Sequence, residues 1–181
     1  MRACCRHGSS VSAPTDRRGP AEPRDLGTPS DVTIRPAVAA DADALTALAM
    51  RSKASWGYDT DMLDAFRDEL TVTADYLAHQ PAFLIEAHGC IAGFYSLQRI
   101  DDTMAELDFL FVDATHIGRG YGRALLDHAR EQARDAGWRA LLIQGDPHAE
   151  PFYLAAGARR AGSRESASIP GRKLPMFELR L

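Results

Sequence analysis

The sequence contains no asparagine, only two lysines against nineteen arginines, and three cysteines in 181 residues. This uneven usage indicates the coding bias of a GC-rich genome, so the arginine and alanine counts carry little functional weight. No apolar run approaches the roughly 18 residues that a membrane-spanning helix needs. The formal net charge is −4, which argues against a general binder of nucleic acids or anionic membranes, since such proteins carry positive surfaces.

The cysteines do not form a recognisable framework. Cys4 and Cys5 are adjacent, Cys90 is isolated, and no CxxC spacing occurs. A set of structural disulfides is therefore not expected, and we predict a cytoplasmic location. Cys90 could serve as a nucleophile, but a lone cysteine in an apolar run is more often a small buried residue.

Residues 1–30 differ in composition from the rest of the chain. They contain four prolines and three glycines with almost no periodic apolar pattern, so they cannot bury enough surface to offset their ordering entropy. We predict a disordered extension; a transit peptide stays open, whereas a secretory signal lacks its apolar core. The formal charge is +2 in this segment and −6 in residues 31–181, which we predict to form one globular domain.

Apolar alternation and helical spacing predict the elements of that domain. Strands are expected at 32–35, 83–87, 90–98, 105–112, 140–143, 159–165 and 173–181, and helices at 41–52, 59–70, 120–135 and 150–156. The run 140–143 has no polar alternation, which indicates a strand buried on both faces. The order predicts an α/β fold: a mixed sheet of about seven strands, about four helices, and one central strand–helix–strand crossover.

The strongest local motif is Gly118-Arg119-Gly120-Tyr121-Gly122-Arg123, between an expected strand and a long helix. Glycines at such a junction let backbone N–H groups converge on an anion, and the helix dipole adds positive charge. A pyrophosphate would fit there, although a glycine-rich connector that serves only packing would show the same pattern. A P-loop is excluded because GxxxxGK[ST] is absent, and a Rossmann motif would follow the first strand.

In this context the sequence resembles the GNAT superfamily of acyl-CoA-dependent N-acetyltransferases over residues 32–181. The segment 117–122 matches the glycines of the family's pyrophosphate loop, with Ile117 in a position that is usually polar. The segment 106–113 is similar to the family's fourth strand. The segment 149–158 resembles its A-x-x-F-Y motif, with Ala158 replacing an aromatic residue.

The resemblance implies a GNAT fold and acetyl-CoA as co-substrate, with no metal. It assigns the thioester carbonyl and the pantetheine arm to backbone groups of the fourth strand, and the pyrophosphate to the glycine loop. The residues expected to bind the coenzyme are Leu110, Phe111, Val112, Gly118, Arg119, Gly120, Tyr121, Gly122 and Arg123.

Acetyl transfer needs a neutral amine, a polarised carbonyl and a proton for the leaving thiolate. The resemblance places Tyr153 as the acid, and the alternative is a half-buried packing tyrosine. Glu106 and Asp108 share a strand face because strand side chains alternate. We predict that Glu106 is the base, directly or through water, although it could only orient a cationic substrate; Asp108 is expected to face the substrate.

Trp56 and Tyr58 would overhang the acceptor cleft of a GNAT fold, unless they merely pack the first two helices together. An aromatic wall above two carboxylates suits a primary amine such as a polyamine, an aminoglycoside or a small amino compound. His148 stands where the family commonly has asparagine, so we expect it at the substrate, although a surface or capping histidine is the alternative.

The predicted function is transfer of an acetyl group from acetyl-CoA to a primary amine of a small molecule, by direct attack in a ternary complex. Two alternatives remain open: a catalytically silent acyl-CoA sensor, and acetylation of a protein N-terminus or lysine. We expect no nucleic-acid or membrane partner. A homodimer is compatible with the resemblance.

Overall fold

The computed structural model describes residues 32–181, and the prediction of a disordered segment 1–30 lies outside the described residues. The described chain forms one seven-stranded mixed sheet with the strand order β1-β2-β3-β4-β5-β7-β6. The strands are β1 (Val32–Pro36), β2 (Ala82–Ala87), β3 (Cys90–Arg99), β4 (Met104–Val112), β5 (Ala140–Gln144), β6 (Arg159–Glu165) and β7 (Lys173–Arg180). The predicted α/β fold with a mixed sheet is confirmed.

The α-helices are α1 (Ala42–Ala54), α2 (Thr60–Ala65), α3 (Ala74–His79), α4 (Tyr121–Asp135) and α5 (Glu150–Ala155). The predicted helix 59–70 is too long: α2 ends at Ala65, turns follow over residues 66–70, and Phe66 is buried in the core. The helix α3 was not predicted. It begins where the Thr73 hydroxyl accepts a hydrogen bond from the Tyr76 N–H, and its six residues are too few for a periodic signal.

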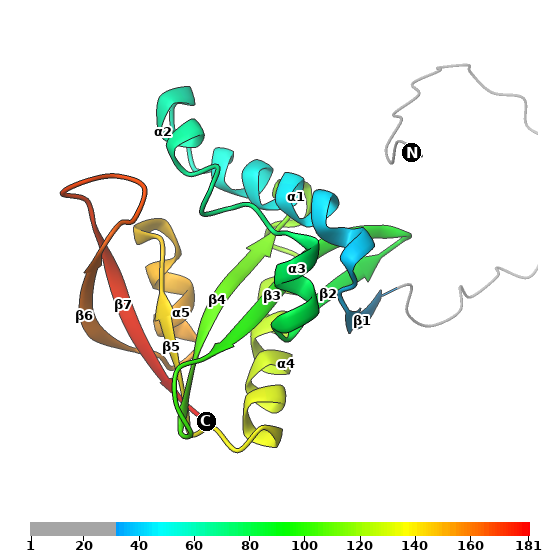
Figure 1. Cartoon of the computed structure of the whole chain (residues 1–181), viewed down its shortest axis with the longest axis vertical. Coiled ribbons are helices and arrows are strands. Elements are labelled where there is room, and N and C mark those ends of the chain that lie inside the picture. Colours follow the sequence, from blue (N-terminus) through cyan, green and yellow to red (C-terminus); the bar gives the residue numbers. More distant parts are fainter. Residues whose placement is uncertain (1–31) are drawn as a thin grey trace, which may run out of the picture.

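Two apolar clusters hold helices on opposite faces of the sheet, so the fold has three layers (Figure 1). One cluster packs α4 and α5 against the sheet, with Leu125 and Phe177 fully buried. The other packs α1 and the segment 66–72, with Leu48 and Phe94 fully buried. Gly93 permits the close approach of α4, since a Cβ there would lie 2.9 Å from Leu125 Cδ1.

The two halves of the sheet separate between β4 and β5. These strands are parallel, as the predicted crossover requires, but they pair only from Met104 with Ala140 to Leu107 with Ile143. On the other side of β4, a bulge places Ser96 opposite Phe109 and Leu97 opposite Leu107, so Asp108 is the extra residue. In Figure 1, β4 and β5 converge toward the C-terminus and diverge toward α2. Residues 108–112 therefore keep one backbone edge without a strand partner.

The edge strand β6 and the cysteine at the start of β3 differ from the buried centre of the sheet. The strand β6 is exposed along its whole length, because only β7 pairs with it. Cys90, which we expected to be a small buried apolar residue, is partly exposed and disulfide-bonded. That expectation is corrected.

Candidate functional site

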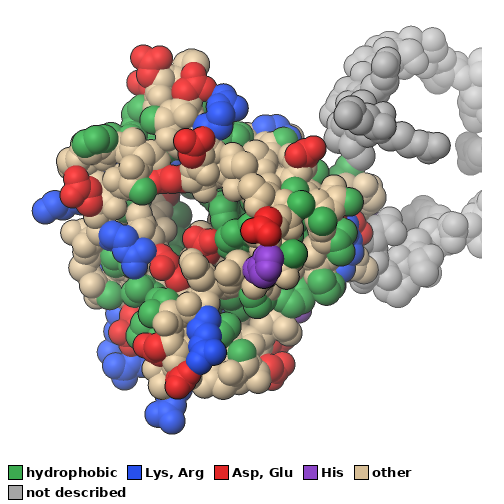
Figure 2. Space-filling view, in the orientation of Figure 1, with side chains coloured by type: hydrophobic (Ala, Val, Ile, Leu, Met, Phe, Trp, Pro, Cys, Tyr) green, Lys and Arg blue, Asp and Glu red, His purple; other side chains and the backbone are tan. Residues whose placement is uncertain are grey.

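A cavity of about 870 Å³ lies where β4 and β5 diverge. Its walls come from β4, the loop before α4, the β5–α5 loop, the end of α1 and the segment 164–174. Figure 2 shows the surface hollowed at this place, with acidic side chains gathered around the opening. The cavity therefore has one end at the glycine loop and another among carboxylates.

The glycine loop turns directly into α4. Gly118 and Gly120 have φ of +82° and +86°, a left-handed conformation that favours glycine. Gly120 is the N-cap of the fifteen-residue α4, and no side chain caps this terminus. The first turn of α4 contains no acidic residue, so its free N–H groups and the helix dipole are available to an anion. This end of the cavity suits a pyrophosphate.

The open edge of β4 continues the same wall. Leu110, Phe111 and Val112 pair with β3 on one side, while on the other side they line the cavity beyond the last β4–β5 pair. Backbone N–H and C=O groups at such an edge can bind an extended, amide-containing chain as an additional strand would. The pantetheine arm of CoA is such a chain, so the residues present fit the coenzyme.

Tyr153 is positioned by α5 and by the end of β5. Its side chain is only 6% exposed and packs against Phe152 and Phe177 with ring centroids 5.2 and 5.5 Å away. Gly145 makes room for it, because a Cβ there would lie 3.1 Å from the Tyr153 ring. Burial, together with the negative charge of Asp146, raises the pKa of Tyr153 well above its usual value. The phenol lines the cavity as a protonated donor, with no hydrogen-bond partner among residues 32–181.

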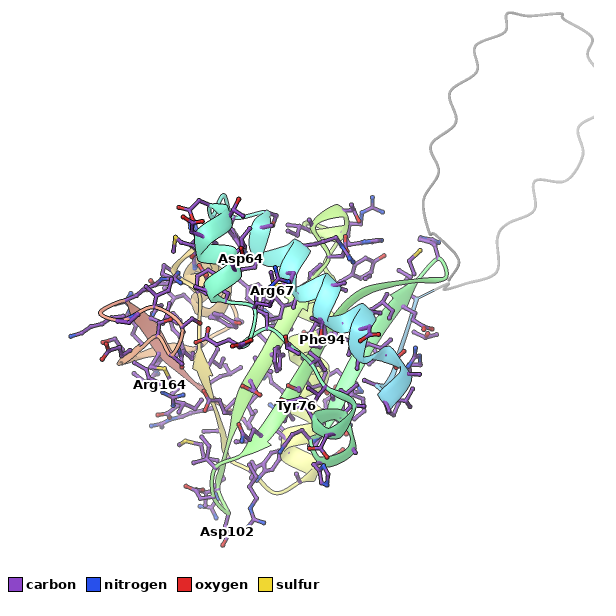
Figure 3. All side chains as sticks on the ribbon, turned by 45° about the horizontal axis from the view of Figure 1, so that its top comes forward. Asp64, Arg67, Tyr76, Phe94, Asp102 and Arg164 are labelled. Atoms are coloured by element: carbon purple, nitrogen blue, oxygen red, sulfur yellow. The ribbon has the colours of Figure 1, made fainter. Side chains whose placement is uncertain are left out.

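The two carboxylates of β4 both line the cavity but have different partners. Glu106 Oε1 accepts a hydrogen bond from Arg164 Nη1 at 2.8 Å. Asp108 accepts one from the Tyr76 hydroxyl at 2.5 Å, and Tyr76 also lies 2.7 Å from the Ser96 hydroxyl. In Figure 3, Arg164 and Tyr76 lie on opposite sides of β4. One carboxylate is thus paired with a cation and the other with a neutral phenol.

Aromatic rings close the cavity above these carboxylates. Trp56, 39% exposed, stacks on His148 with centroids 5.3 Å apart and planes 13° apart. Both residues line the cavity. Tyr58 does not line it; its ring lies edge-on to Phe66 at 5.3 Å and to His148 at 5.8 Å. The Trp56–His148 pair is therefore the aromatic surface that an acceptor would meet.

A largely buried charged cluster joins the loops that carry these rings. Asp146 Oδ2 accepts hydrogen bonds from Lys53 Nζ at 2.5 Å and from the Tyr58 hydroxyl at 2.8 Å. Arg172 donates to the Tyr58 oxygen at 2.6 Å, and its guanidinium lies 5.1 and 5.0 Å from the Tyr58 and Phe66 ring centroids. These contacts tie the end of α1 and the β6–β7 loop to the β5–α5 loop.

Opposing effects set the protonation of this cluster. Burial alone would raise the pKa of Asp146, but hydrogen bonds from Lys53 and the His148 N–H, with the charge of Lys53, lower it. Burial and then the hydrogen bond to Asp146 raise the pKa of Tyr58 to about 12. Asp146 is thus an anion and Tyr58 a neutral donor at neutral pH.

The structure brings most of the sequence-predicted site residues together. All of them line the cavity except Arg119 and Tyr58. Arg123 lines it while pairing with Asp127 one turn further along α4. The sequence reasoning missed Lys53, Gln144, Asp146 and Arg164, whose roles arise from contacts between distant segments. In the sequence, these residues are marked only as polar residues that lie near the predicted strands and loops, which does not distinguish them from other surface residues.

Residues 32–181 hold neither a metal-ligand cluster nor a membrane-spanning helix. No group of three or more His, Cys, Asp or Glu side chains there could hold a metal ion. No helix in the same part of the chain is long and apolar enough to cross a bilayer.

The sheet opens beside a glycine loop, and a buried tyrosine lies at the opening; this arrangement fits a protein that binds a phosphate-containing ligand with an extended arm. The model of the acetyltransferase (GNAT) family matches residues 43–158, so the protein belongs to this family. The resemblance inferred from the motifs is confirmed, and the chain is an acetyl-CoA-dependent acetyltransferase. No curated protein gives a significant sequence match.

Solved structures share the fold. A GCN5-related N-acetyltransferase from Rhodopseudomonas palustris is 22% identical with a TM-score of 0.71, over 84% of this chain and 97% of that one. The PaiA N-acetyltransferase of Thermoplasma acidophilum, solved with coenzyme A, is 17% identical with a TM-score of 0.69, over 84% and 100%. A GNAT acetyltransferase from Elizabethkingia anophelis with acetyl-CoA bound is 18% identical, with a TM-score of 0.59 over 83% and 98%.

Proposed function

We propose that the protein transfers an acetyl group from acetyl-CoA to the primary amine of a small molecule by direct attack. The observation that carries this proposal is the continuity of one cavity, from the uncapped N-terminus of α4 to Glu106 and Asp108. Coenzyme and amine can therefore meet in a single space, and no covalent acyl-enzyme is needed.

In this mechanism the chain's residues polarise the carbonyl and move two protons. Backbone N–H groups around residues 110–112 hydrogen-bond the thioester oxygen as it gains charge. The amine nitrogen attacks the carbonyl carbon, and Glu106 accepts the proton that the nitrogen loses, directly or through a water. When the C–S bond breaks, Tyr153 donates its proton to the departing sulfur; the phenolate then takes a proton from solvent and Glu106 releases one to solvent, which restores both groups. Its raised pKa keeps that donor protonated at neutral pH.

The charge of the acceptor end supports an amine. Glu69, Glu106, Asp108 and Glu165 line the cavity, and of these Glu106 alone is ion-paired within residues 32–181. A surplus of negative charge raises the local concentration of a cationic substrate. We further propose that Trp56, His148 and Asp108 contact the acceptor, whereas Tyr58 packs edge-on against the His148 ring and holds it in place.

A thiol-release assay tests the proposal directly. Purified protein is mixed with acetyl-CoA and a panel of primary amines, amino acids and lysine peptides, while free CoA is followed with a thiol reagent. Turnover with small amines supports the proposal. Tight CoA binding without turnover on any acceptor would indicate a sensor, and turnover on peptides alone would indicate a protein acetyltransferase.

Three further expectations remain proposals: a cytoplasmic location, a homodimer, and a disordered extension at residues 1–30. Fractionation of cells tests the first, light scattering tests the second, and limited proteolysis of the purified protein tests the third.

A further inference from the structure

Arg164 approaches the catalytic cavity from outside the region that the motifs cover. It lies on the exposed edge strand β6, and its side chain is 45% exposed. Its Nη1 donates to Glu106 at 2.8 Å and to the Gln144 side-chain oxygen at 3.2 Å. Arg164 also lines the cavity and lies on the other side of β4 from Tyr76 (Figure 3). A positive charge therefore stands next to the carboxylate proposed to receive the amine.

The pair uses only part of each charged group. Arg164 bonds through Nη1, so Nε and Nη2 have no hydrogen-bond partner within residues 32–181. Glu106 bonds through Oε1, so Oε2 has no such partner in the same range. Arg160 on the same strand differs, because its Nε and Nη2 both hold Glu150 at 2.8 Å. In the Arg164–Glu106 pair, Glu106 Oε2 is therefore available to accept a hydrogen bond from a ligand, and Arg164 Nε and Nη2 are available to donate two.

An α-amino acid has the complementary arrangement, with a nitrogen and a carboxylate on one carbon. We propose that the acceptor is an amino-acid-type molecule whose amine binds Glu106 Oε2 and whose carboxylate binds the Nε and Nη2 edge of Arg164. Paired N–H donors bind a carboxylate with directional, charge-assisted hydrogen bonds. Both ends can bind without breaking the existing pair. This inference rests on the proposed function and specifies its substrate class.

Matched substrates test it: each L-amino acid is compared with the amine that has hydrogen in place of its carboxylate, such as phenylalanine with phenethylamine and lysine with 1,5-diaminopentane. The wild-type protein should show a kcat/KM at least tenfold higher for the amino acid of a reactive pair. Arg164→Gln should lower that value about 10- to 100-fold, through KM, and change the matched amine less than threefold. Arg164→Lys should restore part of the preference.

Arg160→Gln is the control, since it removes an arginine of the same strand that lies outside the cavity, and it should leave both substrates unchanged. Melting temperature and CoA affinity establish that each variant is folded. If Arg164→Gln lowered kcat/KM equally for both substrates, the inference would be overturned. It would also be overturned if Arg164→Gln acetylated the amine faster than the wild type, because Arg164 would then be shielding Glu106 rather than binding a carboxylate. Turnover of carboxylate-free amines alone also overturns it and leaves the proposed function standing, whereas absence of turnover with every acceptor overturns both.

Discussion

The two ends of the cavity are built in different ways. At the end proposed to bind the coenzyme, the wall is formed by the glycine loop, the uncapped N-terminus of α4 and residues 110–112 of β4. At the end proposed to bind the acceptor, the wall includes the side chains of Trp56, Glu106, Asp108 and Arg164, which come from separate elements. The first arrangement depends on local backbone conformation, and the second depends on how distant segments pack.

This difference bears on how each end responds to a change of sequence. Backbone groups are present whatever the side chain, so a site built from them tolerates changes such as Ile117, which is 50% exposed beside the loop. Side chains can be replaced singly, so the acceptor end can change its substrate without disturbing the coenzyme. A mutation at one end should therefore change the binding of one substrate and leave the binding of the other unchanged. The variants below test this expectation and the stability of the cluster that joins the loops.

The largest effect is expected from Asp146→Asn. The change leaves Lys53 and Arg172, whose side chains are 12% and 16% exposed, without the anion between them. Removing one partner of a buried charged group costs about 3 kcal/mol in the free energy of unfolding, or a fall in melting temperature of roughly 6–12 °C. Glu150→Gln, which breaks an exposed pair with Arg160, should barely move the melting temperature. Equal losses in the two variants would contradict the role of the cluster.

The same cluster predicts a pH dependence. The pKa of Asp146 is lower in the folded chain, so its contribution to stability is present above the unfolded pKa, near 3.8, and is lost as the pH falls below it. The raised pKa of Tyr58, about 12, acts in the opposite direction: its contribution is present below pH 10 and lost as the pH approaches 12. Melting curves across both ranges check this, and Asp146→Asn should flatten the acid limb.

The sequence predicts the glycine loop and its flanking elements well because their signals are local. A glycine pair before a helix and an apolar strand before that pair are adjacent in the chain, so the loop, β4 and α4 follow from about thirty residues. The acceptor end could not be predicted in the same way. Arg164 meets Glu106 across 58 positions and Arg172 meets Tyr58 across 114. The bulge at Asp108 and the short helix α3 also depend on packing rather than on periodicity.

Tyr153→Phe should reduce kcat about 100-fold, because the departing sulfur loses its proton donor. Phenylalanine keeps the ring contacts with Phe152 and Phe177, so the KM for acetyl-CoA should stay within about twofold of wild type. Tyr95→Phe is the matched control: that hydroxyl is also buried and lies 2.7 Å from His128 Nδ1, but it does not line the cavity. Steady-state kinetics decide the matter, and an unchanged kcat in Tyr153→Phe would remove the tyrosine from the mechanism.

Gly120→Ala should weaken CoA binding about tenfold and leave the acceptor KM unchanged. The φ of +86° at Gly120 costs an L-residue roughly 1–2 kcal/mol, which the loop would relieve by moving away from the pyrophosphate. Gly137→Ala places the same strain, at φ +85°, beyond the other end of α4. It should lower stability without changing CoA affinity. Calorimetric titration with CoA measures both, and equal losses of affinity would mean that helix stability alone sets binding.

The smallest effect is expected from Trp56→Ala, which removes the ring that stacks on His148 at 5.3 Å. A partly exposed aromatic surface contributes about 0.5–1 kcal/mol to binding a cation or a planar group, so the acceptor KM should rise roughly two- to fivefold while the KM for acetyl-CoA stays constant. Leu154→Ala removes an exposed apolar side chain (46% exposed) outside the cavity and should change neither constant. If Trp56→Ala instead raised the KM for acetyl-CoA, the ring would contact the coenzyme and not the acceptor. If neither KM changed, the ring would only pack α1 against α2.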